Sequence, residues 1–141
     1  MKTKIVLAMM AGVLITQAGY TTKIRALPMP AALQTQKPND VAVYFGDQKH
    51  ANVKTMFGSK EAAVRVARTM DGQEATCNIA LGKALDQLRD YAREQHADAV
   101  INVTTRFQHT QTTSANEFVC GASNNGSTLA VRGDVVKLDV E

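Results

Sequence analysis

The spacing of apolar residues between Cys77 and Phe107 changes from the period of a helix to that of a strand. In the first part, apolar or small residues recur every three or four positions, which places them on one face of an α-helix. That face consists of Cys77, Leu81, Ala84, Leu85, Leu88, Tyr91 and Ala92. From Ala99 onward apolar and polar residues alternate, as they do in a half-buried strand. The residues expected on its apolar face are Ala99, Ile101, Val103 and Phe107.

The ends of this helix carry weaker signals than its middle. Its start is expected between Asp71 and Cys77, with either Asp71 or Thr76 as the N-cap residue. Its end is expected near His96, which takes the left-handed conformation that commonly terminates helices. Gly82 costs about 1 kcal/mol relative to alanine in a helix interior. It indicates either a close approach to a strand or a tolerated defect.

Three extended segments are predicted before the helix. They are Val41–Phe45, Asn52–Phe57 and Glu61–Thr69, the second of which is expected to end at a turn formed by Gly58-Ser59. Helix is a competing interpretation of Glu61–Thr69, because good helix formers open that segment. Two valines at a spacing of two favour a strand.

Further extended segments are predicted after the helix and its strand. The polar stretch Gln108–Asn116 is interpreted as a loop or an exposed hairpin end, and Phe118–Cys120 resumes extended structure. Asn124-Asn125-Gly126 is a tight-turn signal before a last strand from about Thr128 to Val140. Apolar residues change parity along that strand, and a bulge near Gly133-Asp134 would keep them all on the core side.

Together these elements predict an α+β fold. Four to six strands form a mainly antiparallel sheet, and one long α-helix packs across it to make two layers. The chain after any leader has about 120 residues, enough for one domain with one modest core. We expect this single domain to occupy residues 40–141.

The N-terminus has the pattern of a secretory signal peptide at residues 1–19. Lys2 and Lys4 precede an apolar run over residues 5–15, and small and polar residues follow it. The run is shorter than the roughly 20 residues that a membrane-spanning helix needs. A cleaved leader is therefore favoured over a retained membrane anchor.

Cleavage is expected after Ala18 or Gly19, with Ala26 and Ala31 as alternatives. Tyr20 stands where a bacterial lipoprotein would carry cysteine, so lipid anchoring is not expected. The predicted location is the periplasm, with membrane contact only through an uncleaved leader. The following residues 20–39 are rich in Pro, Thr and Gln and are expected to form a flexible linker.

Charge and motifs exclude two classes of partner. The net charge of +3 includes Lys2 and Lys4, so removing the leader lowers it to about +1. No cluster of Lys and Arg interleaved with aromatic residues remains, which argues against nucleic acid. The chain also lacks the Gly-x-x-x-x-Gly-Lys-Ser/Thr motif, so no nucleotide is expected.

The two cysteines carry the sharpest chemical signal. Cys77 lies in the first turns of the helix and Cys120 on a strand, and an even count in an exported chain favours a disulfide. A reactive thiolate at Cys77 is the alternative, because a helix N-terminus lowers the pKa of a thiol. No Cys-x-x-Cys pair or neighbouring base supports that alternative.

No other residues form a recognisable site. His50, His96 and His109 are widely separated and lack metal-ligand spacing, and the Asp47–His50 pair fits a solvated loop. No serine stands in a nucleophile elbow, and no carboxylate pair is placed for acid–base catalysis. We expect no catalytic residues, no cofactor and no metal, and hence no enzyme, with a small metal-binding module as a further alternative.

The order of residues resembles a family of small bacterial envelope domains. The relevant stretches are Cys77 with the helix face, His96-Ala97-Asp98-Ala99-Val100-Ile101-Asn102-Val103, Cys120-Gly121 and Leu129-Ala130-Val131-Arg132-Gly133. They are similar to RcsF, an outer-membrane stress sensor, and to the YbjQ-like proteins, over roughly residues 61–138. The resemblance implies an antiparallel sheet with a helix across it, structural disulfides in exported members, and no enzymatic activity. His96 departs from the family, which usually has glycine there.

These observations lead to one main functional hypothesis. The chain is expected to be a non-enzymatic exported domain that binds an envelope protein or another outer-membrane component, with a role in stress sensing. The alternative from another class is a thiol-based redox protein that uses Cys77.

Overall fold

The computed structural model describes residues 22–34 and 39–139, so the predicted leader at residues 1–19 lies outside the described residues. The elements, in chain order, are β1 (Lys23–Pro28), α2 (Ala31–Gln34), β2 (Ala42–Phe45), β3 (Val53–Ala67), α3 (Gln73–Glu94), β4 (Ala99–Phe107), β5 (Thr110–Thr112), β6 (Glu117–Ala122) and β7 (Gly126–Leu138). No helix in these two ranges has the length and hydrophobicity needed to cross a bilayer.

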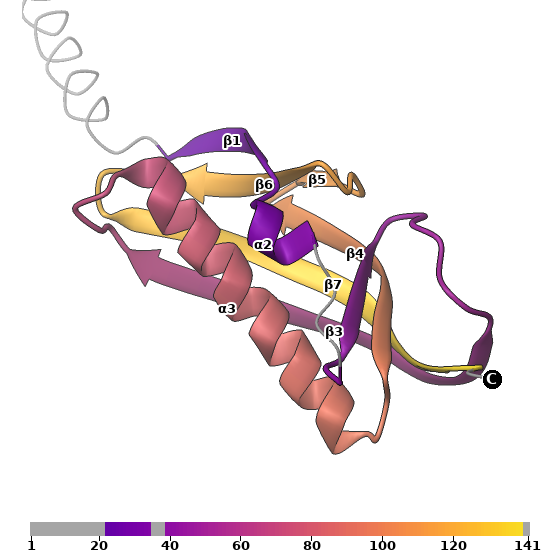
Figure 1. The fold of residues 1–141 in the computed structure, drawn as a ribbon. Coiled ribbons are helices and arrows are strands. Elements are labelled where there is room, and N and C mark those ends of the chain that lie inside the picture. The colour runs from indigo at the N-terminus through magenta and orange to yellow at the C-terminus, as the bar shows by residue number, and fades with distance from the viewer. Residues whose placement is uncertain (1–21, 35–38, 140–141) are drawn as a thin grey trace, which may run out of the picture.

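The described strands form one sheet with β7 at its centre (Figure 1). β3 pairs with one side of β7, while β4 and β6 pair with the other side. β1 extends the sheet beyond β6, and β2 and β5 pair with β4. All of these pairings are antiparallel except that of β2 with β4.

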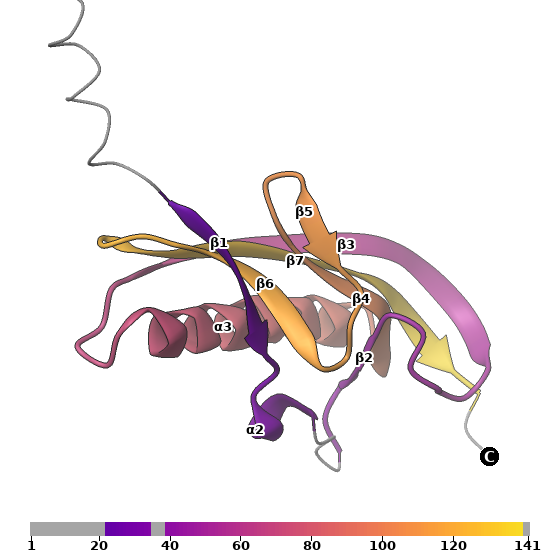
Figure 2. The same ribbon diagram turned by 90° about the horizontal axis from the view of Figure 1, so that it is seen from above.

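The α+β class with one long helix is confirmed, but the predicted simple antiparallel sheet is wrong. The sheet is mixed because the chain leaves β2, passes through β3 and α3, and returns as β4 in the same direction, which is the long crossover that a parallel pair requires. It is also curled rather than flat (Figure 2). Bulges in β3 and β4 supply part of that curvature, since an extra residue bends a strand and increases its twist.

α3 lies along one face of the sheet and buries the predicted apolar stripe (Figure 1). Leu81, Leu85 and Leu88 are fully buried and belong to the same cluster as Val131 and Val135 of β7. The buried residues of α3 are Thr76, Cys77, Ala80, Leu81, Ala84, Leu85, Leu88 and Ala92, whereas Tyr91 is only partly buried. The main core therefore lies between α3 and the sheet face beneath it.

α3 begins at Gln73, within the predicted range, and its end also agrees with the prediction, but its N-cap residue does not. Gly72 is the N-cap residue, with φ 101°, and no side chain caps the helix, so neither Asp71 nor Thr76 has the predicted role. The Thr76 hydroxyl instead donates to the Gly72 carbonyl oxygen at 2.7 Å. At the other end His96 adopts the predicted left-handed conformation, with φ 59°.

Gly82 does not mark a close approach of the helix to a strand. A Cβ added there would meet no atom within 4 Å outside the local helix backbone. We expect Gly82→Ala to raise the free energy of unfolding by about 1 kcal/mol, because alanine has less backbone entropy to lose in a helix. Urea unfolding of the two proteins measures the difference, and an unchanged or lower midpoint would contradict the interpretation of Gly82 as a tolerated defect.

The second and third predicted strands are one continuous strand, β3. The strand interpretation of residues 61–69 is confirmed over helix as far as Ala67, but the predicted turn at Gly58-Ser59 is wrong. Gly58, with φ 118°, is accommodated within the strand next to a register shift against β7. Another shift lies between Val53 and Thr55, so both irregularities fall in the first half of β3.

A bulge in β4 changes which residues face the helix. Asn102 has φ 55°, and the pairing of β4 with β7 shifts between Ile101 and Thr104. Val100 and Val103 therefore join the main core, whereas Ala99 and Ile101 belong to a second cluster. The predicted common face for Ala99, Ile101 and Val103 is wrong because the bulge reverses the alternation.

The bulge predicted in β7 lies in β4 instead. β7 pairs with β4 from Val136 back to Ala130, and the extra residue opposite Gly133 belongs to β4. Val135 faces α3, so Val136 and Leu138 face the opposite way. There they cluster with Ala99 and Ile101, and with Ala42 and Tyr44 of β2. The change of parity reflects a second apolar cluster on the face away from the helix.

The C-terminal hairpins agree with the sequence prediction. The tight turn at residues 124–126 joins β6 to β7, and the Ser123 amide donates to the Gly126 carbonyl oxygen at 2.9 Å. Of the two interpretations of the polar stretch Gln108–Asn116, the hairpin end is confirmed, because Thr110–Thr112 forms β5 against β4.

The predicted flexible linker is corrected by β1. Lys23–Pro28 pairs with β6 along its whole length, and α2 follows at Ala31–Gln34. Leu27 and Met29 are each only 4% exposed and belong to the main core. The free energy gained by burying these two side chains offsets the conformational entropy lost when this Pro-rich stretch becomes ordered. The folded domain therefore begins by Lys23 rather than at residue 40.

Candidate interaction surface

The structure joins the two cysteines in a disulfide. Cys77 and Cys120 have an S–S distance of 2.10 Å and a Cα–Cα distance of 6.1 Å. Both residues are fully buried, and the Ser127 hydroxyl lies 3.4 Å from the Cys77 sulfur. The bond connects the first turns of α3 to β6, which is the pairing predicted from the sequence. In this state Cys77 offers no thiolate for redox chemistry.

The three histidines lie in separate places. His50 stacks against Tyr44 with ring centroids 5.5 Å apart, in the loop between β2 and β3. His96 follows α3, and His109 is exposed in the hairpin between β4 and β5. In the part of the chain that the structure describes, no three His, Cys, Asp or Glu side chains gather where they could hold a metal ion.

An open hollow of about 500 Å³ lies at the C-terminal end of α3. Its charged groups already bind one another, since Arg93 Nη2 donates to Asp40 Oδ1 at 2.6 Å. This bond, with a further one from the Val41 amide, lowers the pKa of Asp40, and the same pair raises the pKa of Arg93. Asp98, also in the lining, accepts a bond from the Leu138 amide at 2.8 Å. The Arg93–Asp40 pair thus holds α3 to the segment before β2, and the Asp98 bond holds the segment between α3 and β4 to β7.

A smaller hollow of about 220 Å³ lies on the sheet face away from α3. In its lining, Asp134 accepts hydrogen bonds from the Ser59 hydroxyl at 2.7 Å and from the Asn102 side-chain amide at 2.9 Å. Thr104, Gln111 and Arg132 also line it with polar groups. Because the carboxylate is already bonded on both oxygens, the arrangement fixes the β4 bulge against β3 and β7.

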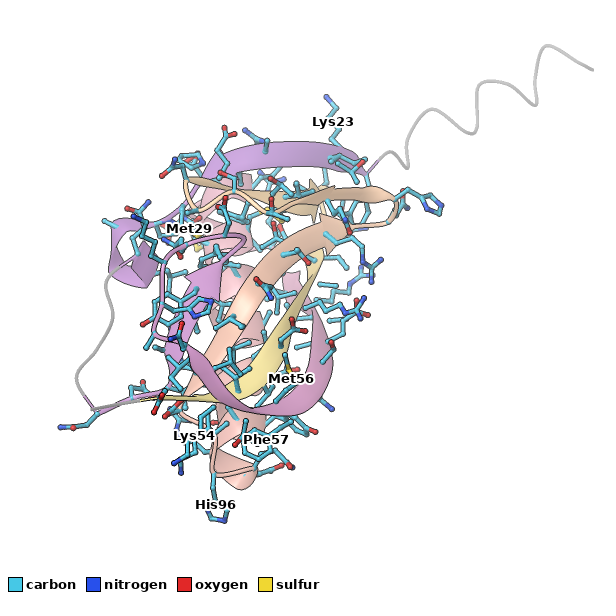
Figure 3. The ribbon with its side chains drawn as sticks, turned by 90° about the vertical axis from the view of Figure 1, so that its right-hand side faces the viewer. Lys23, Met29, Lys54, Met56, Phe57 and His96 are labelled. Carbon is cyan, nitrogen blue, oxygen red and sulfur yellow. A yellow bond between two sulfur atoms is a disulfide. The ribbon has the colours of Figure 1, made fainter. Side chains whose placement is uncertain are left out.

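The outer side of β3, which we call the β3 edge, has the features of an interaction surface. Within residues 22–34 and 39–139, β3 pairs with β7 and with no other strand, so its second side has no strand beside it. Val53, Met56 and Phe57, at its start, are 39%, 54% and 36% exposed. Figure 3 shows Met56 and Phe57 beside Lys54, far from Lys23 of β1. Exposed apolar side chains next to the free side of an edge strand are typical of protein-binding sites.

The apolar start of the β3 edge continues the second cluster. Val53 pairs with Leu138 and Met56 pairs with Val136, so each lies on the same face as its partner. Val136 is fully buried within that cluster. A partner covering Val53 and Met56 would therefore extend an existing apolar core rather than cover isolated side chains.

The β3 edge could not be found from the sequence strand by strand. Residues 53–57 and 61–67 look like two short segments, because Gly58-Ser59 has the composition of a turn. Which side of β3 lacks a neighbour depends on the pairing order of the whole sheet. The available signal was the presence of charged Lys60, Glu61 and Arg65 within a short β-rich segment, since charged side chains are common on edge strands.

Comparisons with known proteins establish similarity of fold alone. No family model matches the chain, and no curated protein matches its sequence. A crystal structure of a protein of unknown function from Pediococcus pentosaceus, belonging to the DUF74 family, superposes with a TM-score of 0.50 at 12% identity. The match covers 70% of this chain and 98% of that chain.

Proposed function

We propose that this chain is a non-enzymatic, exported domain that binds another component of the bacterial envelope, with a role in sensing envelope stress. The observation that carries the proposal is the β3 edge, the side of a 15-residue strand on which no described strand pairs, with exposed Val53, Met56 and Phe57 at its start. Covering solvated apolar side chains at such a position removes apolar surface from water, which stabilises the complex with a partner.

Two observations support export to the periplasm. The N-terminal sequence has the order of charged, apolar and small residues that signal peptides share. A buried disulfide joins both cysteines of the chain, and disulfides persist in oxidising compartments such as the periplasm. The resemblance to the RcsF- and YbjQ-like domains points to the same compartment and to a binding role without catalysis.

The proposal predicts that a photo-crosslinking aromatic residue at position 57 captures one specific envelope component in the native host. The benzophenone analogue of phenylalanine keeps the ring of Phe57 and adds a reactive ketone at the surface. Irradiation of intact cells followed by electrophoresis and mass spectrometry identifies the product. We expect one dominant crosslinked band, because a specific partner covers the same side chain in every complex.

Ile24 supplies the matched control. It is 47% exposed, also apolar and also on an edge strand, but it lies on β1 rather than β3. The same analogue at position 24 is expected to give no such band. Equal capture at both positions would indicate nonspecific contact, and no capture at position 57 would overturn the proposed binding function.

A further inference from the structure

We propose that the second half of the β3 edge, from Ser59 to Ala67, binds an extended acidic peptide segment as an additional strand. This inference rests on the proposed binding function and names the chemistry of the partner. The apolar start of β3 supplies contact area for the partner. The second half selects a partner that is extended and acidic.

The backbone of this stretch is suited to pairing. Ser59 to Ala67 pairs with β7 from Asp134 to Gly126 without a register shift, and both shifts of β3 lie before it. In a regular strand, successive backbone N–H and C=O groups alternate between the two sides. The groups directed away from β7 therefore form a regular row about 30 Å long, and no strand of the described residues pairs with them.

α3 provides a wall beside this row. Ala62 and Val66 are buried in the main core under α3, and Val64 and Tyr91 are partly buried at its boundary. The Lys60 ammonium lies 4.7 Å from the centroid of the Tyr91 ring, so this part of β3 runs next to the helix. An added strand would place alternate side chains against Val64 and Tyr91. Strand addition beside a helix is an established mode of peptide recognition, in which backbone bonds give affinity and side chains give specificity.

The charges of the edge select an acidic partner. Lys60 and Arg65 have no carboxylate within ion-pair distance among the residues that the structure describes, whereas Glu61 is paired with Arg106 at 2.8 Å. The stretch thus presents two cations without an ion-pair partner, Lys60 over the Tyr91 ring and Arg65 on the opposite face of the strand, beside one neutralised carboxylate. Acidic residues in the added strand would complement them, which favours correct partners and speeds association.

A second copy of this chain fits the edge less well. Antiparallel pairing of β3 with itself would add the Lys60 and Arg65 of a second copy to an edge that already carries these two cations, whereas an acidic peptide would neutralise them. The early bulges and Gly58 add to this effect, since such irregularities keep edge strands from pairing with themselves.

Selection from a random library of displayed peptides of about ten residues, using the mature disulfide-bonded chain, tests the inference. We expect enriched peptides to combine apolar residues with Asp or Glu. Backbone amide hydrogen exchange with one synthetic enriched peptide should then show new protection within residues 59–67. Enriched peptides that lack acidic residues, or that protect another segment, would overturn the inference.

Charge reversal sharpens this test. The double substitution Lys60→Glu and Arg65→Glu is expected to weaken binding of that peptide by about tenfold or more, while Lys23→Glu on β1 leaves it unchanged. Urea midpoints of both variants show whether they fold as the parent does. If a variant does not fold, the exchange data on the parent still test the inference.

The two proposals can fail separately. Capture of a partner through position 57 without any peptide protecting residues 59–67 would overturn only the strand-addition inference. Peptide binding at residues 59–67 without capture in cells would overturn the proposed envelope function instead.

Discussion

Reduction of the Cys77–Cys120 disulfide is expected to lower the free energy of unfolding by about 4 kcal/mol. The bond joins residues 43 positions apart. In the chain-entropy model, closing a loop of that size lowers the entropy of the unfolded chain and so destabilises the unfolded state by this free energy. Domains of this size hold only about 5–15 kcal/mol in total. Urea unfolding with and without reductant measures the loss, and the expected fall in midpoint is about 2 M.

The double variant Cys77→Ala and Cys120→Ala is the control for this prediction. It should unfold near the midpoint of the reduced parent, and reductant should not change its midpoint. Two alanines avoid leaving a single buried thiol in a core where both positions are fully buried. Equal midpoints for the oxidised and reduced parent would show that the disulfide does not constrain the unfolded chain.

Gly133→Ala is expected to lower the free energy of unfolding by about 2–3 kcal/mol. A Cβ at Gly133 would collide with Val100 Cγ1 and would lie 2.9 Å from Val103 Cγ2 and 3.3 Å from the Ile101 carbonyl oxygen. Both valines are fully buried, and β-branched side chains have few rotamers into which they can retreat. Overpacking of this kind typically costs 1–3 kcal/mol.

Gly82→Ala is the matched control, because it adds the same methyl group at a position with open space. The two substitutions should change stability in opposite directions, and urea unfolding measures both. Loss of stability at position 82 as well as at 133 would contradict an explanation based on local packing. A Gly133→Ala variant as stable as the parent would show that β4 can shift away from β7 at its bulge.

The elements whose signal is local were predictable from the sequence. The period of the apolar face located α3, and the left-handed His96 ended it within two residues of the observed boundary. The tight turn at residues 124–126 was also predicted, since Asn-Gly chemistry acts over a few residues. The pairing of Cys77 with Cys120 followed from the count of two in a chain with a leader pattern.

The features that depend on distant neighbours were not predictable. The sequence places Ala99, Ile101 and Val103 on one face only if the strand is regular. The bulge at Asn102 breaks that assumption. Residues 23–28 look like a linker because their strand pairing depends on β6, far along the chain. The β3 edge belongs to the same class, because which side of β3 lacks a neighbour depends on the pairing order of the whole sheet.

The parallel pairing of β2 with β4 has a consequence for the order of folding. Pairing of Ala42 with Ala99 closes a long loop that contains all of β3 and α3. The entropy lost in closing that loop opposes the pairing until late in folding. β2 has only four residues and lies at the border of the sheet. We therefore expect this strand to dock last in refolding and to open first in the native protein, with the fastest amide exchange among the strands that pair with β4.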